Sequence, residues 1–320
     1  MFMQSRCIIR YINLTTGLVF LILFIFSGFS QALVLTDHHQ RRIVFDKPFQ
    51  RIISLYGAHT ENLYHLGAEN QIVGISINDT LSSNADQKEK FSYHDDPEKF
   101  LAFSPDLVLI RPMIDNGYPE LIQRLEKSGI MVVSLQPSDI DEMYVYWRNL
   151  GFLTGKIESA EKMIQEFKKK TDRIRTLTRN LHPKKRVYFE AIHAKMKTFT
   201  KGAMPLFILE TAGGVNIASG AVASRGTNIA VFGKEQLLSK ASEIDVFLAQ
   251  TGIMNPISME EIKKEPGFNI ITAIKNNQVY LIDENIISRP VPRLYEGMIT
   301  IGKILYPDIF TEEQLNKEMK

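Results

Sequence analysis

Short apolar runs recur along the first third of the chain, and segments with helical character separate them. β-Branched residues dominate these runs, as is typical of strands covered on both faces of a sheet. Helix stop signals, Gly67 and Gly129, follow two of the intervening segments. Strands that alternate with helices predict parallel βαβ units with right-handed crossovers. The apolar runs are 51–55, 72–76, 107–110 and 130–134, and the helical segments are 60–66, 97–101 and 118–128.

A long helical pattern follows this region. Apolar residues recur every three or four positions from 158 to 181, and Pro183 ends the pattern. At 1.5 Å per residue, such a helix is a rod of roughly 36 Å. The strand–helix alternation then restarts, with strands expected at 186–190, 246–249 and 278–282 and helices at 207–212 and 294–305.

These patterns predict an α/β protein of two lobes, with mostly parallel sheets, joined by one long rigid helix. A cleft between two similar lobes is a natural place for a small ligand. The expected divisions are a signal peptide at 1–32, an N-terminal tail at 33–41, an N-terminal lobe at 42–141, a helical region with the interlobe helix at 142–183, a C-terminal lobe at 184–310 and a C-terminal tail at 311–320.

The first 32 residues have the pattern of a secretory signal peptide. Arg6 and Arg10 precede a short apolar run at 18–26, and small residues follow it up to Ala32. We therefore expect export to the periplasm with cleavage after Ala32. An uncleaved anchor is the alternative, whereas the single cysteine, Cys7, precedes the apolar run and so disfavours a lipoprotein.

Composition excludes several classes of function. The chain has 38 Lys and Arg against 36 Asp and Glu, and removal of Arg6 and Arg10 leaves 36 of each. Near-neutrality argues against a nucleic acid partner held by bulk electrostatics. One cysteine excludes an intrachain disulfide and cysteine-rich metal centres. Hydrolase, zincin and dinucleotide-binding motifs are missing from the sequence, so we expect neither an enzyme nor a resident cofactor.

Five segments, in the correct order, resemble the periplasmic substrate-binding proteins of ABC importers for ferric siderophores, haem and cobalamin. The first runs from an apolar strand through Thr60-Glu61 to Leu66-Gly67, and the second contains Pro105-Asp106-Leu-Val. The resemblance covers about residues 42–310. Its segments are 51–68, 97–110, 211–218, 234–246 and 288–294.

This resemblance implies a monomeric protein that captures an iron complex (siderophore or haem) or cobalamin in the interlobe cleft and delivers it to a membrane permease. Glu98 and Glu235 begin matching helices of the two lobes. In this family, glutamates at these positions pair with arginines of the permease. The alternative is that both are ordinary acidic residues, which are common at helix N-termini because they interact favourably with the helix dipole.

Loops that face the cleft in this family supply the candidate ligand contacts. A tyrosine and a histidine could ligate a haem iron or stack on a corrin or catechol, and an arginine would suit anionic groups. Arg293 is expected as a cap on the last helix, and Trp147 as packing between the lobes. The candidates are Tyr56, His59, Tyr93, His94, His193, Arg225, Asn228 and Arg289, with Tyr56 and His59 as metal ligands if the cargo is haem.

Two alternatives remain open at this point. The same scaffold could bind a bare metal ion or an oxyanion such as molybdate, for which His59, His94 and His193 would be the ligands at hand. An exported enzyme or envelope interaction protein would instead require an acid–base pair within hydrogen-bond reach.

Overall fold

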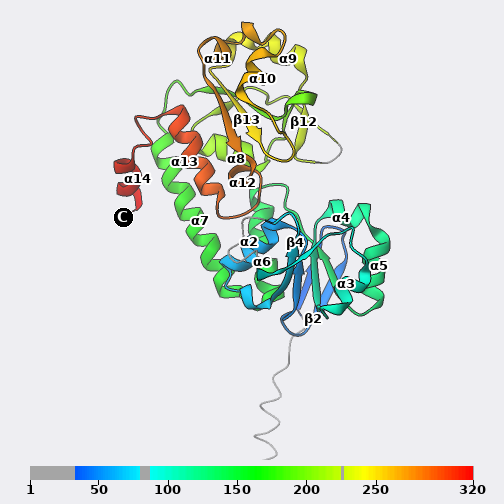
Figure 1. Ribbon diagram of the computed structural model, residues 1–320. Coiled ribbons are helices and arrows are strands. Elements are labelled where there is room, and N and C mark those ends of the chain that lie inside the picture. Colours follow the sequence, from blue (N-terminus) through cyan, green and yellow to red (C-terminus); the bar gives the residue numbers. More distant parts are fainter. Residues whose placement is uncertain (1–32, 80–86, 225–226, 320) are drawn as a thin grey trace, which may run out of the picture.

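Two α/β lobes are stacked end to end in the computed structural model, which describes residues 33–79, 87–224 and 227–319. Helix α7 (Ile157–Thr178) runs along both of them (Figure 1). It buries Ala160, Ile164, Phe167 and Ile174 at the spacing that the sequence predicts. None of the described helices has both the length and the apolar character needed to cross a membrane.

The N-terminal lobe is built on a five-stranded sheet in the order β5-β4-β3-β6-β7, and every pair is parallel. All four residues of β6 are buried, as the apolar run there predicts. The strands are β3 (Ile52–Ser54), β4 (Ile72–Ser76), β5 (Glu89–Phe91), β6 (Leu107–Ile110) and β7 (Met131–Ser134). The helices are α2 (Gly57–His65), η1 (Glu69–Gln71), α3 (Pro97–Ala102), α4 (Pro112–Gly117) and α5 (Pro119–Lys127).

The C-terminal lobe has a mixed sheet in the order β11-β12-β9-β8-β13-β14, with β10 also paired to β8. Strands β8, β10, β13 and β14 are parallel to one another, and an antiparallel part extends one side. The strands are β8 (Arg186–Ile192), β9 (Lys197–Phe199), β10 (Val215–Asn216), β11 (Val222–Ala223), β12 (Ile229–Val231), β13 (Val246–Thr251) and β14 (Val279–Asp283).

Helices surround this second sheet and connect it to the first lobe. The terminal helix α13 has the bounds that the sequence predicts. The helices are η3 (His193–Lys195), α8 (Met204–Thr211), α9 (Lys234–Ser239), η4 (Ala241–Glu243), α10 (Met259–Lys264), η5 (Phe268–Ile270), α11 (Thr272–Lys275), α12 (Glu284–Ile287) and α13 (Leu294–Leu305).

Two helices, rather than one, form the connecting region. The side chain of Asp139 caps α6 (Ile140–Thr154) by accepting hydrogen bonds from the amides of Asp141 and Glu142. Gly155 ends α6 with φ of 70°, a left-handed conformation that favours glycine, and α7 begins at Ile157. Gly155 thus divides the helical region expected at 142–183 into two helices.

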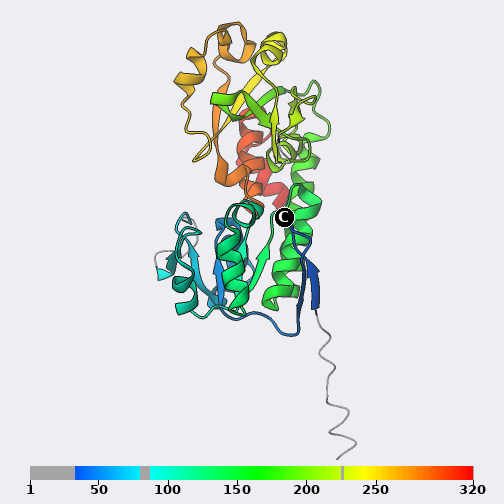
Figure 2. The same cartoon turned by 90° about the vertical axis from the view of Figure 1, so that its right-hand side faces the viewer.

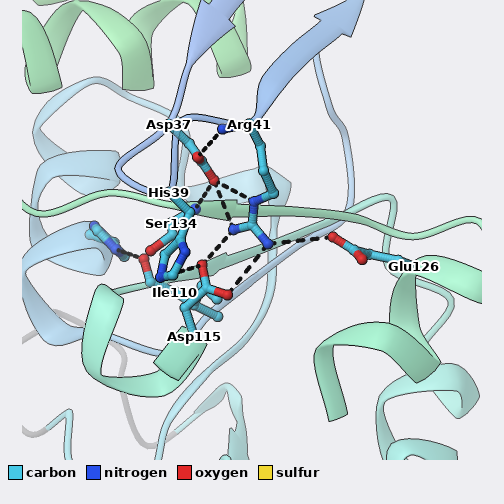
Figure 3. A network of polar contacts seen from close by, with 8 residues as sticks. Asp37, His39, Arg41, Ile110, Asp115, Glu126 and Ser134 are labelled. Atoms are coloured by element: carbon cyan, nitrogen blue, oxygen red, sulfur yellow. Dashed lines mark hydrogen bonds and ion pairs between the residues drawn. The ribbon is translucent and has the colours of Figure 1, made fainter. Parts of the chain in front are cut away.

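The two segments expected as tails are folded. Strands β1 (Leu33–Thr36) and β2 (Arg42–Phe45) pair as a hairpin, and Leu35 lies in the core. Figure 3 shows how Arg41 connects the hairpin turn to the N-terminal lobe: its side chain donates to Asp37 at 2.8 Å and to Asp115 at 2.6 Å. At the other end of the chain, α14 (Glu312–Met319) packs on α7 through Leu315. The strands are only four residues long, and α14 has a single leucine among polar residues, so neither segment shows a clear periodicity in the sequence.

Candidate functional site

The carboxyl ends of the parallel strands face one another between the lobes. Helix α4, which follows β6, lies on the upper side of the lower lobe, and α12, which follows β14, lies on the lower side of the upper lobe (Figure 1). Ligands of open α/β sheets bind outside the carboxyl ends of the strands. The facing segments are therefore where a ligand site is expected.

Tyr56 is the centre of a charged group at this junction. It precedes α2, and the guanidinium of Arg111 lies 5.0 Å from the centre of its ring. Burial raises the pKa of the Tyr56 phenol, and the nearby charges of Arg111 and Arg289 oppose this shift. Glu284, from the second lobe, adds a smaller upward effect on the same pKa. We call Tyr56, Arg111, Glu284 and Arg289 the interlobe site.

Arg289 reaches across from the C-terminal lobe to the start of α2. A Cβ atom at Gly57 would lie only 2.8 Å from Nη1 of Arg289, so the small residue lets the guanidinium approach the backbone. This Nη1 atom is buried and has no hydrogen-bond partner. Among the described residues, Arg111 and Arg289 both lack a carboxylate within ion-pair distance. Two half-buried guanidinium groups that form no ion pair with a described carboxylate make an environment suited to an anion.

Hydrogen bonds hold a second set of contacts between the lobes. The carbonyl oxygen of Pro290 accepts from Nδ2 of Asn62 and from Nε1 of Trp147, each at 3.0 Å. Nε of Arg293 donates to the buried carboxylate of Glu61, also at 3.0 Å. We call these five residues the interlobe latch. Trp147 thus connects the lobes as expected, and Arg293 is structural through Glu61 rather than through a helix cap.

The predicted ligand contact at His59 is wrong. The side chain is completely buried, Nε2 lies 2.9 Å from the carbonyl oxygen of Ile110, and Nδ1 lies 2.7 Å from the hydroxyl of Tyr146. Because a carbonyl only accepts, Nε2 must donate and Nδ1 must accept from Tyr146. Burial lowers the pKa of His59 to about 4, which keeps the ring neutral. It has no free nitrogen for a haem iron or any other metal.

His193 also has internal partners for both ring nitrogens, contrary to its predicted role as a ligand contact. Nδ1 lies 3.0 Å from the buried carboxylate of Glu190, and Nε2 lies 3.6 Å from Glu265. The hydrogen bond to Glu190 raises the pKa of His193. Lys234 also pairs with Glu265, so the cluster braces the C-terminal lobe. No three His, Cys, Asp or Glu side chains gather into a metal-holding group within the described ranges.

An aromatic cluster forms at the end of β5. Tyr93 packs 4.7 Å from Tyr118, and His94 lies edge-on to Tyr118 at 5.0 Å, measured between ring centres. The Tyr118 hydroxyl and Nε2 of His94 are 3.2 Å apart. His94 is exposed and Tyr93 is half-buried, so both remain candidates for stacking on a ligand.

The two remaining ligand candidates lie beside β12. Arg225 falls outside the described residues. Asn228 is half-buried, and its backbone carbonyl accepts a hydrogen bond from the amide of Thr200. Its side chain has no hydrogen bond within the described part of the chain, and its role in binding stays a prediction.

Glu98 and Glu235 occupy equivalent places in the two lobes. Each is the second residue of a short helix, α3 or α9, and both side chains are exposed. Glu98 pairs with Arg124 at 2.6 Å, whereas Glu235 has no ion pair with any described residue. Exposed pairs of this kind contribute little to stability and exchange partners readily.

Two grooves, of about 320 and 290 Å³, follow α7 at other places on the surface. Residues such as Lys162 and Phe167 line the first, and Tyr144 and Phe207 line the second. Neither groove contains a residue of the interlobe site. Arg111 and Arg289, one from each lobe, have no ion pair with a described residue, whereas Lys162 pairs with Glu166 in the first groove and Arg175 with Asp172 in the second. The interlobe site is therefore the candidate ligand site.

Sequence reasoning missed Arg111 and Glu284. Both directly follow strands of the parallel sheets, β6 and β14. A charged residue at the carboxyl end of a buried strand is a readable signal, since those ends converge on ligand sites. For Arg111, this signal was available from the run 107–110 alone.

Known proteins resemble this chain along most of its length. The family described as periplasmic binding protein matches residues 52–286. A Bacillus subtilis protein, the uncharacterized ABC transporter substrate-binding lipoprotein YvrC, is 24% identical over 280 residues, which is 86% of each chain. The vitamin B12-binding protein of Vibrio cholerae is 25% identical over 257 residues, or 79% of this chain and 88% of that protein.

Solved structures show the same architecture. A possible iron-binding, periplasmic solute-binding protein from Staphylococcus epidermidis has a TM-score of 0.71 at 28% identity, covering 81% of this chain and all of that one. CeuE from Helicobacter pylori, solved as a nickel–histidine complex, has a TM-score of 0.68 at 23% identity and covers 91% and 93% of the two chains. At its lower identity, the second likeness concerns the fold alone.

Proposed function

Because the chain belongs to the periplasmic binding protein family, we propose that it captures an iron complex (siderophore or haem) or cobalamin between its lobes and delivers it to the permease of an ABC importer. The main support for the proposal comes from two arginines, Arg111 and Arg289, which approach Tyr56 from opposite lobes and form no ion pair with a described carboxylate. The family and the named relatives are binding proteins, and we propose the same for this chain, without enzymatic activity.

The charge of the site favours an anionic iron complex among these cargoes. Ferric catecholates and haem propionates carry negative groups that guanidinium can bind through paired hydrogen bonds. Cobalamin is the second candidate, because relatives that align over most of the chain are named vitamin B12-binding protein or cobalamin-binding protein. A molybdate-type oxyanion would also suit two arginines, and it stays the alternative on the same scaffold.

Ligand-dependent stabilisation tests this proposal. The mature chain, residues 33–320, is heated with a ferric catecholate, haemin, cyanocobalamin or molybdate, each well above the protein concentration. Because a ligand that binds only the folded state adds about 2.7 kcal/mol at 100 times its Kd, we expect a clear rise in Tm with an iron complex. A rise with molybdate alone would move the assignment to an oxyanion. No rise with any of the four would overturn the proposed ligand class.

We also propose that Glu98 and Glu235 dock the loaded protein on the permease. Their equivalent positions and exposure support this role. Charges of this kind set orientation and association rate more than affinity. The double variant Glu98→Arg and Glu235→Arg should abolish uptake in cells while ligand affinity stays within twofold of the parent. Exposed Glu158→Arg on α7 is the matched control, and loss of ligand binding in the double variant would contradict the docking role.

Export completes the proposal. We infer that residues 1–32, which lie outside the described ranges, are removed after Ala32 and that the remainder works as a monomer in the periplasm. We also propose that the two lobes comprise residues 42–141 and 184–310, as expected from the sequence. The mass of the intact protein from the periplasm should match a chain that begins at Leu33. A mass that includes residues 1–32 would indicate the uncleaved anchor instead.

A further inference from the structure

The loop that follows β13, residues 252–258, places apolar side chains where polar ones are usual. Ile253 is 81% exposed and Met254 is 53% exposed, whereas the neighbouring Asn255 is only 3% exposed. Large aliphatic residues are normally buried and asparagine is normally exposed. In this loop the usual burial is reversed: Asn255 is buried, and Ile253 and Met254 lie on the surface.

The loop is rigid enough to hold these side chains in place. Oδ1 of Asn255 accepts from the amide of His193 at 2.9 Å, and its Nδ2 donates to the carbonyl of Gln250 at 2.7 Å. Gly252 and Asn255 form a backbone bridge across the turn. Beyond the turn, Ser258 and Glu261 form a capping box at the start of α10. A pre-formed apolar surface loses little conformational entropy when a partner covers it.

The tip lies beside the interlobe site. The carboxylate of Glu284 packs against Gly252, where a Cβ atom would come 2.5 Å from Oε2. The same carboxylate is close enough to affect the pKa of Tyr56. Figure 2 shows the loop, in yellow, at the lower edge of the upper lobe and turned toward the lower lobe. Exposed apolar residues also follow two strands of the lower lobe, with Ile77 after β4 and Met113 in α4 after β6.

We propose that Ile253 and Met254 form an apolar wall of the ligand site, and that the cargo is an anionic complex with an apolar or aromatic face. The anionic part binds Arg111 and Arg289, and the apolar face lies on the tip of the loop. This inference rests on the proposed function and narrows it, because a bare ion or a small oxyanion offers no surface to such a wall. It also identifies two specificity-determining residues outside the charged part of the site.

The test compares Ile253→Ser/Met254→Ser with the parent and with Val215→Ser. Val215 is 43% exposed and pairs with Arg186 at the amino end of β8, away from the facing strand ends. Dissociation constants for haemin and a ferric catecholate are measured by quenching of the fluorescence of Trp147, the only tryptophan. Unchanged Tm values confirm that the variants fold. We expect the double variant to bind the preferred complex at least tenfold more weakly and Val215→Ser to stay within twofold.

Three other results would contradict the proposal that Ile253 and Met254 form an apolar wall of the ligand site. If the parent binds an iron complex and the double variant binds it equally well, the apolar wall is overturned while the proposed function stands. If that variant binds normally but fails in uptake, the tip belongs to the permease surface and the inference is equally overturned. If the parent binds neither complex, the preference for an anionic iron complex fails and this inference fails with it, whereas a rise in Tm with cyanocobalamin would leave the proposed function standing.

Discussion

Arg289 and Arg293 lie on the same loop, four residues apart, and differ in every respect that bears on role. Nε of Arg293 donates to the buried Glu61 of the other lobe at 3.0 Å, and beside it Asn62 and Trp147 donate to the carbonyl oxygen of Pro290. Arg289 reaches the same lobe but keeps a buried Nη1 without a partner. The same loop therefore contributes a hydrogen bond that connects the lobes, through Arg293, and an unpaired hydrogen-bond donor at the interlobe site, through Arg289.

This difference separates structural from functional charge. A folded protein rarely leaves a buried donor unpaired, because desolvation then costs free energy with no return. Under the proposed function, the unpaired donor of Arg289 at the junction of facing strand ends is a group that an anionic cargo would bind. The hydrogen-bonded latch residues beside it hold the two lobes together. The latch should therefore respond to mutation through stability and the site through affinity.

The latch extends inward to His59, and acid should weaken it most. Nδ2 of Asn62 donates to both Pro290 and the Tyr146 hydroxyl, which in turn donates to His59. The pKa of His59 is about 4 in the folded chain, below the ordinary value of 6.5. The unfolded chain thus binds more protons between these values, and the stabilisation present above pH 6.5 is lost as pH falls toward 4, by roughly 3 kcal/mol.

Urea denaturation at a series of pH values from 7 to 4.5 checks this loss. His59→Gln removes the titrating group, so its free energy of unfolding should fall less steeply with acid than that of the parent. Titration of His193 cannot produce this loss of stability in acid. Because its pKa is raised in the folded chain, its contribution to the free energy of unfolding is present at low pH and is lost as pH rises. Equal slopes for parent and variant would contradict the burial of a neutral His59.

Removal of the latch arginine should have the next largest effect. Arg293→Ala leaves the carboxylate of Glu61, 5% exposed, without its partner. Because Arg293 is itself half-buried and water can enter, we expect a loss of about 2 kcal/mol, less than for a fully buried pair. Arg289→Ala is the matched control from the same loop and should change the free energy of unfolding by less than about 0.5 kcal/mol. Equal losses would abolish the distinction between the two arginines.

The smallest expected effect concerns Trp147. Trp147→Phe keeps an aromatic ring in the core but removes the donor to the carbonyl of Pro290, which retains Asn62 as a partner. The loss of one such hydrogen bond is worth about 1 kcal/mol. Thermal or chemical unfolding measures it directly. A loss well above 2 kcal/mol would mean that Trp147 contributes mainly through packing.

The fold followed from periodicity because the elements concerned are buried on regular faces. The bounds of α13 and the position of β6 were both readable from the spacing of apolar residues. The hairpin β1–β2 was not, since its stability depends on Arg41 meeting Asp115, 74 residues away. Local pattern does not encode a partner at that distance.

The site was less predictable for the same reason. His59 and Tyr56 are three residues apart, and both were expected at the ligand. His59 turns inward only because Tyr146 and Ile110, 87 and 51 residues away, bind its two nitrogens. The position of Arg111 after a buried strand was readable, but its contact with the ring of Tyr56 was not, because the two residues are distant in the sequence. The sequence thus indicates which strand ends carry charges but not which charges remain unpaired.

The measurement that tests the central claim most directly is the affinity of the double variant Arg111→Gln/Arg289→Gln for the iron complex that the parent binds. Loss of two charge-assisted contacts should weaken binding by about 100-fold, at about 1.4 kcal/mol for each tenfold change. The variant should unfold at the same urea concentration as the parent. Weakened binding with unchanged stability is the predicted result. Affinity within twofold of the parent would contradict the assignment of the interlobe site as the place where the cargo is held.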